Sequence, residues 1–390
     1  MVFSRLRWFS GLLAIGMAIA LLLHLPIAAT ANPPMTELRG IWLTNIDSEV
    51  LFSSRNVVSG LRRLRYLNFN TLYPTVWNGG YTQYPSPTAL ATFGIEQDPY
   101  PGFAGRDMLG EMVVEGHRQG MAVIPWFEFG LMAPAQSELV EQHPDWVTQK
   151  RDGDQIWMEG GVIPRVWLSP SHPEVQDFMV NLLTEAVRRY RVDGIQLDDH
   201  FGIPVAFGYD PITINKYKAE HNGAEPPEDA RDPDWVRWRA NEITQLMRRV
   251  VTEVKAINPD CVISMSPNPR KFSYDEYLQD WGSWERRGLI DELIVQVYRY
   301  NMERFEFEID RADVQTAKEF LPVSIGILAG LRNNITDMSL INEQVEAVRD
   351  RGYAGVAFFF YETLGNRDSL FRGLFPTPAR RPEPRNLGFD

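Results

Sequence analysis

The sequence predicts an α/β protein with the architecture of a (β/α)8 barrel, the TIM barrel. Eight short β-type runs alternate with longer segments of helical periodicity; this order is typical of a parallel sheet, and eight such units close a barrel. The chain has 390 residues, 44% of them hydrophobic, which suffices for one large barrel. An open doubly wound sheet is the alternative, but the chain carries no G-x-G-x-x-G or Walker-type loop.

Each expected strand is a run of aliphatic, β-branched or aromatic residues bounded by polar residues, Gly or Pro. In chain order the eight runs are Glu37–Asn45, Phe69–Trp77, Met121–Gly130, Val192–Phe201, Cys261–Pro269, Asp291–Asn301, Pro322–Gly330 and Tyr353–Leu364. A clear helical segment follows seven of them, and a short one at Asp368–Phe371 follows the last.

The helical segments show apolar residues at a spacing of three or four. After the first strand, Val57, Leu61 and Leu64 recur in this way. The long segment after the fourth strand begins with Asp232 as an expected N-cap and Pro233 at the first helical position. After the third strand the chain makes an excursion in which Asp152-Gly153, flanked by β-type residues, predicts a β-hairpin.

The two ends of the chain differ in composition from this repeat. Arg5 and Arg7 precede an apolar stretch that ends in Ala29-Thr30-Ala31, the pattern of a secretory signal peptide over residues 1–31. An uncleaved membrane anchor is the alternative. Residues 376–390 are Pro-rich and predict a surface-hugging or disordered tail. We therefore expect one catalytic domain over residues 32–375 of an exported protein, which is periplasmic, in the cell envelope or secreted.

Composition excludes some partners. The formal net charge is −12, so nucleic acid is not an expected partner, and membrane contact is expected only through the N-terminal segment if it is uncleaved. The single cysteine, Cys261, stands among apolar residues and is expected in the core.

The active site of a (β/α)8 barrel lies at the carboxyl ends of its strands. The fourth strand ends with Asp198, Asp199 and His200. Because side chains alternate along a strand, Asp198 and His200 should face the barrel mouth, whereas Asp199 shares the parity of Ile195 and Leu197. Asp199 is therefore expected to turn away, to cap a helix or hold a loop.

Glu128 ends the third strand on the same face as Ile124 and Trp126, so it is expected to reach the same mouth. Two carboxylates across a sugar-binding mouth are the equipment of glycoside hydrolysis. One acid must hold a proton for the leaving oxygen, and the other attacks the anomeric carbon or activates water. Asp198, Asp199 and Glu128 are the candidate catalytic residues.

Aromatic and polar side chains crowd the same strand ends and predict a carbohydrate site, since aromatic faces stack on sugar rings while amides and carboxylates bond hydroxyls. The aromatics of the polar loop at residues 77–87 are favoured, because nothing near them in sequence would bury them. The candidate substrate-binding residues are Trp42, Asn45, Tyr73, Trp77, Tyr81, Trp126, His200, Asn268, Gln296, Tyr298, Tyr300 and Glu362.

Three motifs carry a resemblance to a known family. "ELRGIWLTN", "LNFNTLYPTVW" and "VDGIQLDDHF" together resemble the bacterial glycosyl-hydrolase-like family 10, over about residues 37–375. The resemblance implies a (β/α)8 barrel, an exported location and glycosidase activity on a polysaccharide, with peptidoglycan glycan strands as a substrate in part of the family. The family's fourth-strand motif usually reads D-G-I/V-x-F/L-D-D-Y, and His200 stands where Tyr is common.

Family 18 chitinases are a more distant analogue. Asp193 and Asp198 match two of their fourth-strand acids and Tyr298 lies on the sixth strand, but Gln196 and His200 replace other motif acids. A substrate-assisted mechanism would therefore need another proton donor, such as Glu128.

Two alternatives to hydrolysis remain. A metal-dependent polysaccharide deacetylase normally needs a His-x3-His pair, and none of the six histidines forms one. We accordingly expect no metal and no cofactor. A non-catalytic glycan-binding barrel would keep the aromatics and use the acids structurally.

Overall fold

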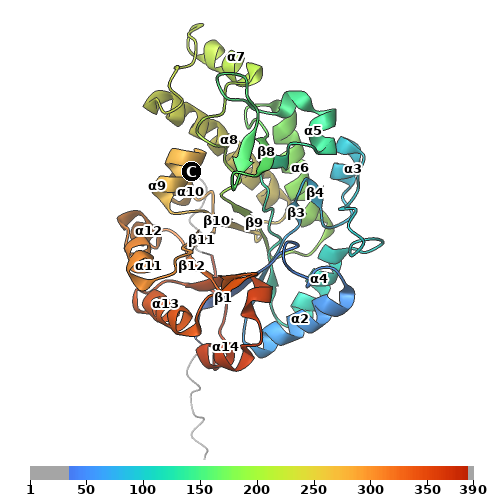
Figure 1. Ribbon diagram of the computed structural model, residues 1–390, viewed down its shortest axis with the longest axis vertical. Helices are drawn as coiled ribbons and strands as arrows, with labels where there is room; N and C mark the ends of the chain where they lie inside the picture. The colour runs from blue at the N-terminus through green and yellow to red at the C-terminus, as the bar shows by residue number, and fades with distance from the viewer. Residues whose placement is uncertain (1–34, 385–390) are drawn as a thin grey trace, which may run out of the picture. The chain divides into compact units, whose positions relative to one another are not determined.

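The computed structural model describes residues 35–384, within which eight parallel strands form one sheet (Figure 1). In order of hydrogen-bonded neighbours these are β5 (Ala122–Val123), β2 (Thr71–Pro74), β1 (Leu38–Leu43), β15 (Gly355–Phe359), β12 (Val323–Leu328), β11 (Glu292–Gln296), β10 (Val262–Ser266) and β9 (Gly194–Asp198). The sheet closes between β9 and the residues after β5, where Phe127 N donates to Gln196 O and Gln196 N to Pro125 O, both at 2.9 Å. The predicted (β/α)8 barrel is confirmed.

Helices cover the outside of the barrel. They are α2 (Ser54–Tyr66), α4 (Met108–Arg118), α6 (Pro173–Arg189), α8 (Pro233–Ile257), α9 (Arg270–Tyr277), α10 (Trp281–Arg286), α11 (Met302–Ile309), α12 (Ala312–Ala317), α13 (Met338–Asp350) and α14 (Asp368–Leu374). Asp232 caps α8 as predicted, accepting from the backbone N–H groups of Asp234 and Trp235. Among the described residues no helix is long and apolar enough to cross a membrane. The signal segment expected at residues 1–31 lies outside the described residues.

Excursions at the carboxyl ends of the strands build the walls of the mouth. They contain β3 (Trp77–Asn78), β4 (Tyr81–Thr82), α3 (Pro87–Phe93), β6 (Met132–Pro134), α5 (Glu138–Gln142), β7 (Trp157–Glu159), β8 (Ile163–Trp167), α7 (Pro211–Glu220), β13 (Gly330–Leu331) and β14 (Asn334–Ile335). The hairpin expected after the third strand is present, but its turn lies at Gly160-Gly161 between β7 and β8. Asp152-Gly153 forms only a local turn, because residues 146–148 pair with residues 167–169 rather than with β7.

The barrel interior holds an apolar layer and a chain of hydrogen bonds. Trp42 Nε1 donates to Gln196 Oε1 over 2.7 Å, and Gln196 Nε2 donates to Ser264 Oγ over 3.0 Å. Ser264 and Tyr73 in turn donate to Glu292 over 2.8 and 2.9 Å. Glu292 is buried and pairs with Arg381. A buried carboxylate needs such partners, so this network fixes the floor beneath the mouth.

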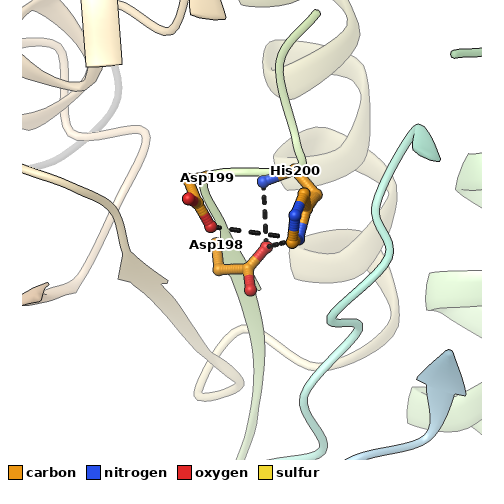
Figure 2. A group of neighbouring side chains, drawn as sticks. All are labelled: Asp198, Asp199 and His200. Carbon is orange, nitrogen blue, oxygen red and sulfur yellow. Dashed lines mark hydrogen bonds and ion pairs between the residues drawn. The ribbon is translucent and has the colours of Figure 1, made fainter. Parts of the chain in front are cut away.

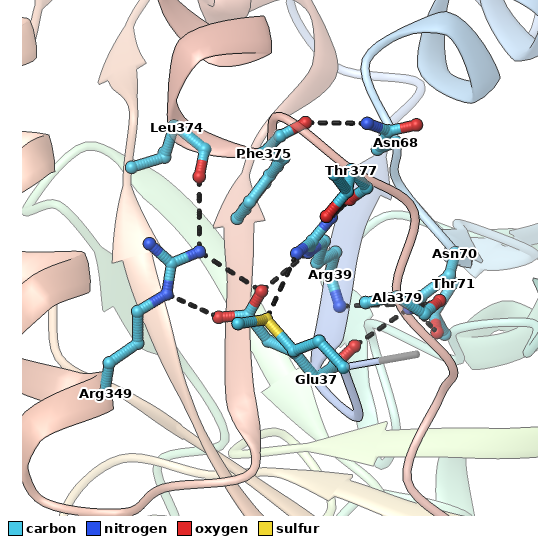
Figure 3. Close-up of polar contacts among 11 residues, drawn as sticks. Glu37, Arg39, Asn68, Asn70, Thr71, Arg349, Leu374, Phe375, Thr377 and Ala379 are labelled. Carbon is cyan, nitrogen blue, oxygen red and sulfur yellow. Dashed lines mark hydrogen bonds and ion pairs between the residues drawn. The ribbon is translucent and has the colours of Figure 1, made fainter. Parts of the chain in front are cut away.

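The amino-terminal end of the barrel is closed where the chain before β1 meets the residues after α14 (Figure 3). Glu37 accepts from Arg39 Nε and Arg349 Nε, both at 2.6 Å, and Arg39 Nη1 donates to Thr377 O over 2.5 Å. Asn70 Nδ2 donates to Ala379 O over 3.2 Å. The described part of the Pro-rich tail therefore packs against the barrel, and Arg381 enters its interior.

Candidate active site

Asp198 is the last residue of β9 and lies on the floor of the mouth, only 2% exposed. Trp126 Nε1 donates to its Oδ2 over 3.1 Å, and the backbone N–H of His200 donates to its Oδ1 over 3.0 Å. Burial raises the pKa of Asp198 to about 6, although the positive charge of His200 opposes this shift. Asp198 therefore faces the mouth, as its strand parity predicts.

Glu128 reaches the mouth beside Asp198 from the segment after β5. Asn78 Nδ2 donates to its Oε2 over 2.5 Å, and Thr75 Oγ1 lies 3.5 Å from the same oxygen. Burial, followed by the negative charge of Asp198, raises the pKa of Glu128 to about 8. Glu128 thus holds its proton at neutral pH more readily than Asp198 does.

His200 joins the acids into one cluster with Asp198 and Asp199 (Figure 2). Its Nδ1 bonds the backbone carbonyl of Glu128 over 2.9 Å and lies 3.5 Å from Asp198 Oδ1. Burial opposes protonation, but the charges of Asp199 and Asp198 outweigh it and raise the pKa of His200 to about 10. The imidazole is therefore a cation at neutral pH, with Nδ1–H as the donor.

Asp199 differs from its prediction. It does not turn away toward the helix layer: its Oδ2 accepts from Asn268 Nδ2 over 2.7 Å, and its Oδ1 lies 3.9 Å from His200 Nδ1. The strict alternation ends with β9 at Asp198, after which the chain turns so that Phe201 N donates to Asp198 O. Asp199 and Asn268 therefore lie together at the mouth, on the β10 side.

Tyr298 follows β11. Its ring stacks on Phe359 at 5.6 Å between centroids and 30° between planes. Burial, together with the charges of Asp199, Asp198 and Glu128, raises the pKa of its hydroxyl well above the ordinary value. The hydroxyl is thus neutral and close enough to all three carboxylates to feel their charge.

The prediction is wrong for three of the aromatic residues that were expected to bind substrate. Trp77 is fully buried; its Nε1 donates to Gly130 O over 3.2 Å and its ring packs on Phe178 at 5.7 Å. Tyr73 and Trp42, at 0% and 1% exposure, lie within the barrel beneath the mouth and belong to its hydrogen-bond chain. The loop at residues 77–87 folds back onto α6, which no local sequence pattern reveals.

Other expected binding residues lie around the rim. Gln296 is half-buried and donates to Ser266 O over 2.7 Å, whereas Tyr300 is 57% exposed. Glu362 accepts from Glu49 N over 2.7 Å and so holds the loop after β1. Tyr81 is half-buried, and its hydroxyl donates to Glu138 over 2.7 Å. Glu362 and Tyr81 therefore support loops.

Asn45 lines a hollow of about 410 Å³ together with Phe52, Tyr100 and Arg332. Its Oδ1 is buried and has no hydrogen-bond partner among residues 35–384. An unpaired buried oxygen is costly, and a bound hydroxyl would satisfy it. Asn45 lies two residues after β1, and its role in substrate binding stays a prediction.

Sequence reasoning missed several residues that shape the site. Asn78 holds Glu128, and Gln279 Nε2 donates to Asp198 O over 2.7 Å. The ring of Trp167 lies 5.8 Å from that of His200. The end of the second strand could have indicated Asn78. Gln279 and Trp167 come from excursions whose path only the fold defines.

A barrel with clustered carboxylates at the carboxyl ends of its strands is the architecture of TIM-barrel glycoside hydrolases. The family model described as glycosyl hydrolase-like 10 matches residues 37–347, and the chain belongs to this family. The resemblance to this family that the three sequence motifs predicted is confirmed.

Curated relatives agree with this family. Glycosyl hydrolase DigH of Escherichia coli (strain K12) is 27% identical over an alignment of 323 residues that covers 69% of this chain and 67% of DigH. Glycosyl hydrolase YngK of Bacillus subtilis (strain 168) is 22% identical over 420 residues, with 93% of this chain and 76% of YngK covered.

Solved structures share the fold. The PgaB (BpsB) glycoside hydrolase domain from Bordetella bronchiseptica superposes with a TM-score of 0.66 at 13% identity, covering 87% of this chain and 98% of that domain. Alpha-L-fucosidase isoenzyme 2 from Paenibacillus thiaminolyticus gives 0.60 at 15% identity, covering 85% of this chain and 49% of the fucosidase.

Proposed function

We propose that this protein is a glycoside hydrolase that cleaves O-glycosidic bonds of a polysaccharide, with peptidoglycan-type cell-wall glycan as its substrate. The observation that carries the proposal is the pair Glu128 and Asp198, two neighbouring carboxyls whose pKa values are raised to about 8 and about 6. Near pH 7 one carboxyl is protonated and the other ionised, which is the division of labour that glycoside hydrolysis needs.

In the proposed reaction Glu128 donates its proton to the glycosidic oxygen as the bond to the anomeric carbon breaks. The leaving sugar departs with a free hydroxyl. Asp198 either attacks the anomeric carbon or removes a proton from the water that does so. A water molecule supplies the hydroxyl of the new reducing end. If Asp198 attacks, the ionised Glu128 takes a proton from this water as it releases Asp198; if Asp198 acts as the base, it keeps the water proton until solvent carries one back to Glu128.

Neighbouring groups support these roles. Trp126 Nε1–H and the His200 backbone N–H stabilise the ionised form of Asp198. Asn78 fixes the orientation of Glu128, and its donated bond leaves the other carboxyl oxygen available to carry the proton. Asp199, bound by Asn268, is assigned a supporting role in holding His200 as a cation.

The cell-wall substrate and the exported location rest on other observations. Family membership and the fourth-strand motif support a glycan, and the segment at residues 1–31 has the composition of a secretory signal. The rim residues Asn45, Asn268 and Tyr298 supply an amide-rich, aromatic surface suited to sugar hydroxyls and rings.

Release of reducing ends from purified, peptide-free cell-wall glycan tests the proposal. Asp198→Asn and Glu128→Gln should each lower the rate by at least roughly 10²-fold while the glycan still binds. Glu285→Gln is a matched control, since Glu285 is a buried acid on α10 whose pKa burial raises to about 7. A chain that binds glycan but releases no reducing ends would be a non-catalytic glycan-binding barrel.

One observation favours a second candidate, a metal-dependent polysaccharide deacetylase. Asp198, Asp199 and His200 offer ligand atoms that all lie within 4.8 Å of one another, so they could hold a cation. Against it, His200 Nδ1 is bonded to a carbonyl and its pKa is raised to about 10, whereas a ligating imidazole is neutral. Release of acetate that a chelator abolishes would establish the deacetylase instead.

A further inference from the structure

A second hollow lies outside the barrel mouth, between α8 and α10, with α7 at one end. Its volume is about 620 Å³. We propose that this hollow, which we call the α8–α10 groove, binds a segment of a neutral, hydroxyl-rich saccharide chain. The Asp198 cluster does not contribute to its lining, so the binding itself does not depend on the proposed hydrolysis.

The groove has a floor of small side chains. Ala240 and Thr244 come from α8, and Ser283 comes from α10; all three are buried. Trp284 Nε1 donates to Thr244 Oγ1 over 2.9 Å and so fixes α10 against α8 at this level. The groove is therefore held open by packed helices, and its shape exists before a ligand arrives.

Trp238 forms a rigid wall. Its ring stacks on Trp235 at 5.2 Å and 14°, meets Tyr217 edge-on at 5.3 Å and 85°, and its Nε1 donates to Glu220 over 2.8 Å. The half-buried ring is thus fixed on one face and lines the groove. A preordered indole loses little conformational freedom when a sugar ring stacks on it.

The rest of the lining offers unused hydrogen-bonding groups. Within residues 35–384, the side chains of Asn241 and Arg287 and the hydroxyl of Tyr274 make no hydrogen bond. Asp280 Oδ1 is buried and has no hydrogen-bond partner among the described residues, although Arg270 Nη2 lies 3.9 Å from it. Donors and acceptors of both kinds around an aromatic wall match a ring of hydroxyls.

The balance of acidic and basic side chains in the groove favours an uncharged ligand. The groove contains two acids, Asp234 and Asp280, and two arginines, Arg237 and Arg287, so that their formal charges cancel. Asp234 and Arg237 already pair at 2.5 Å. Neither a polyanion nor a strongly basic peptide gains a net electrostatic attraction here.

Part of the groove lining comes from the excursions that follow β9 and β10, and β9 also carries Asp198 at its end. α7 follows β9, and α9 follows β10; the two excursions are joined by Val205 N–Glu276 O at 2.8 Å and Ile203 N–Tyr277 O at 3.0 Å. A polymer held in the groove therefore raises the local concentration of its other segments near the mouth. Only this role as a polymer anchor rests on the proposed function.

A printed array of neutral oligosaccharides, differing in sugar and linkage, tests the binding in the full chain carrying Asp198→Asn. We expect at least one oligosaccharide whose binding drops at least tenfold when Asn241→Trp, a change at an exposed position, fills the groove. Trp238→Ala should lose the same binding. Thr252→Trp, exposed further along α8 and outside the groove, is the matched control and should bind as the parent does. If Asn241→Trp leaves the binding of every arrayed saccharide unchanged while folding normally, the groove is not a saccharide site.

A second measurement separates this inference from the proposed function. In the chain with Asp198 intact, Asn241→Trp should retain its kcat/KM on a short oligosaccharide and lose at least fivefold on the polymer. Absence of hydrolysis with every substrate would overturn the proposed function. The array would still show whether the α8–α10 groove binds saccharide. Equal loss on short and long substrates would overturn the anchoring role.

Discussion

Trp126 donates its indole N–H to Oδ2 of Asp198 over 3.1 Å, so an interior aromatic after β5 orients the carboxylate at the end of β9. The bond crosses the seam where the barrel closes, because Trp126 and Gln196 are bridge partners. Closure of the barrel and orientation of the candidate catalytic acid therefore both involve Trp126.

Trp126→Phe removes this donor and keeps an aromatic ring. The ionised form of Asp198 loses a hydrogen bond, so its pKa should rise and the acid limb of the kcat/KM profile should move to higher pH. Since a hydrogen bond to a charged group is worth about 1.5–3 kcal/mol, we expect kcat/KM to fall roughly tenfold or more at pH 6. Trp146→Phe is the control, because it removes an N–H that is donated to Glu174 and not to Asp198 or Glu128. This variant should leave the pH profile unchanged.

Activity should follow a bell-shaped pH profile. Asp198 must be ionised, which favours pH above about 6, and Glu128 must be protonated, which favours pH below about 8. The two neighbouring acids titrate as a coupled pair, so the limbs report the pair. A maximum near pH 4 would contradict the assignment of Glu128 as the proton donor. Reducing-end release measured across pH 4–10 gives the profile.

Glu128→Gln should stabilise the protein at neutral pH while abolishing activity. The folded-state pKa of about 8 lies above the ordinary value of 4.5, so the folded chain binds this proton more tightly. Its stability contribution is complete below about pH 4.5 and declines as the pH rises toward 8. Gln carries no such dependence; we expect a gain of about 3 kcal/mol, roughly 4 °C in Tm, at pH 7 and none at pH 4. Thermal unfolding at both pH values measures it.

Glu37→Gln should destabilise the closed end of the barrel. Burial opposes ionisation of Glu37, but bonds from Arg349 and Arg39 outweigh it and lower its pKa. Removing the anion leaves two arginines unpaired, at a cost of about 3 kcal/mol at pH 7. Because the folded-state pKa is lowered, this contribution is present above about pH 4.5 and is lost as the pH falls through the lowered pKa of Glu37, so the difference between the two proteins should narrow in acid.

Chemical denaturation at pH 7 and pH 3 follows the Glu37 effect. Glu225→Gln removes an exposed acid paired with Lys218 on α7 and should cost less than about 0.5 kcal/mol at either pH. Equal loss of stability for both variants would show that the Glu37 cluster has no special role.

Arg381→Ala tests whether the tail belongs to the folded domain. Glu292 is buried, and without Arg381 its charge keeps only the bonds from Ser264 and Tyr73. We expect a loss of about 3 kcal/mol and a similar loss for a chain ending at residue 375. If both variants unfold as the parent does, the domain ends before the tail, as its composition suggests.

The sequence alone determined the order and number of the strands, the cap of α8, and the placement of Asp198 and Glu128 at the mouth. These follow from local rules: periodicity gives the element type, and alternation along a strand gives the face of each side chain. Pro125, which has no backbone N–H, is one reason why the regular part of the third strand stops at Val123, although its pairing continues to Trp126.

Only the tertiary structure determined which aromatic side chains are buried and where the Asp199 side chain lies. Trp77 is buried against Phe178, about a hundred residues later in the chain, and Asp199 meets Asn268 because β9 and β10 are neighbours. Likewise, Arg381 reaches Glu292 only once the barrel exists. Burial and pKa depend on distances between residues far apart in sequence, whereas periodicity records only near neighbours. The sequence therefore places the acids at the mouth, and the closed barrel gives each its neighbours and its protonation state.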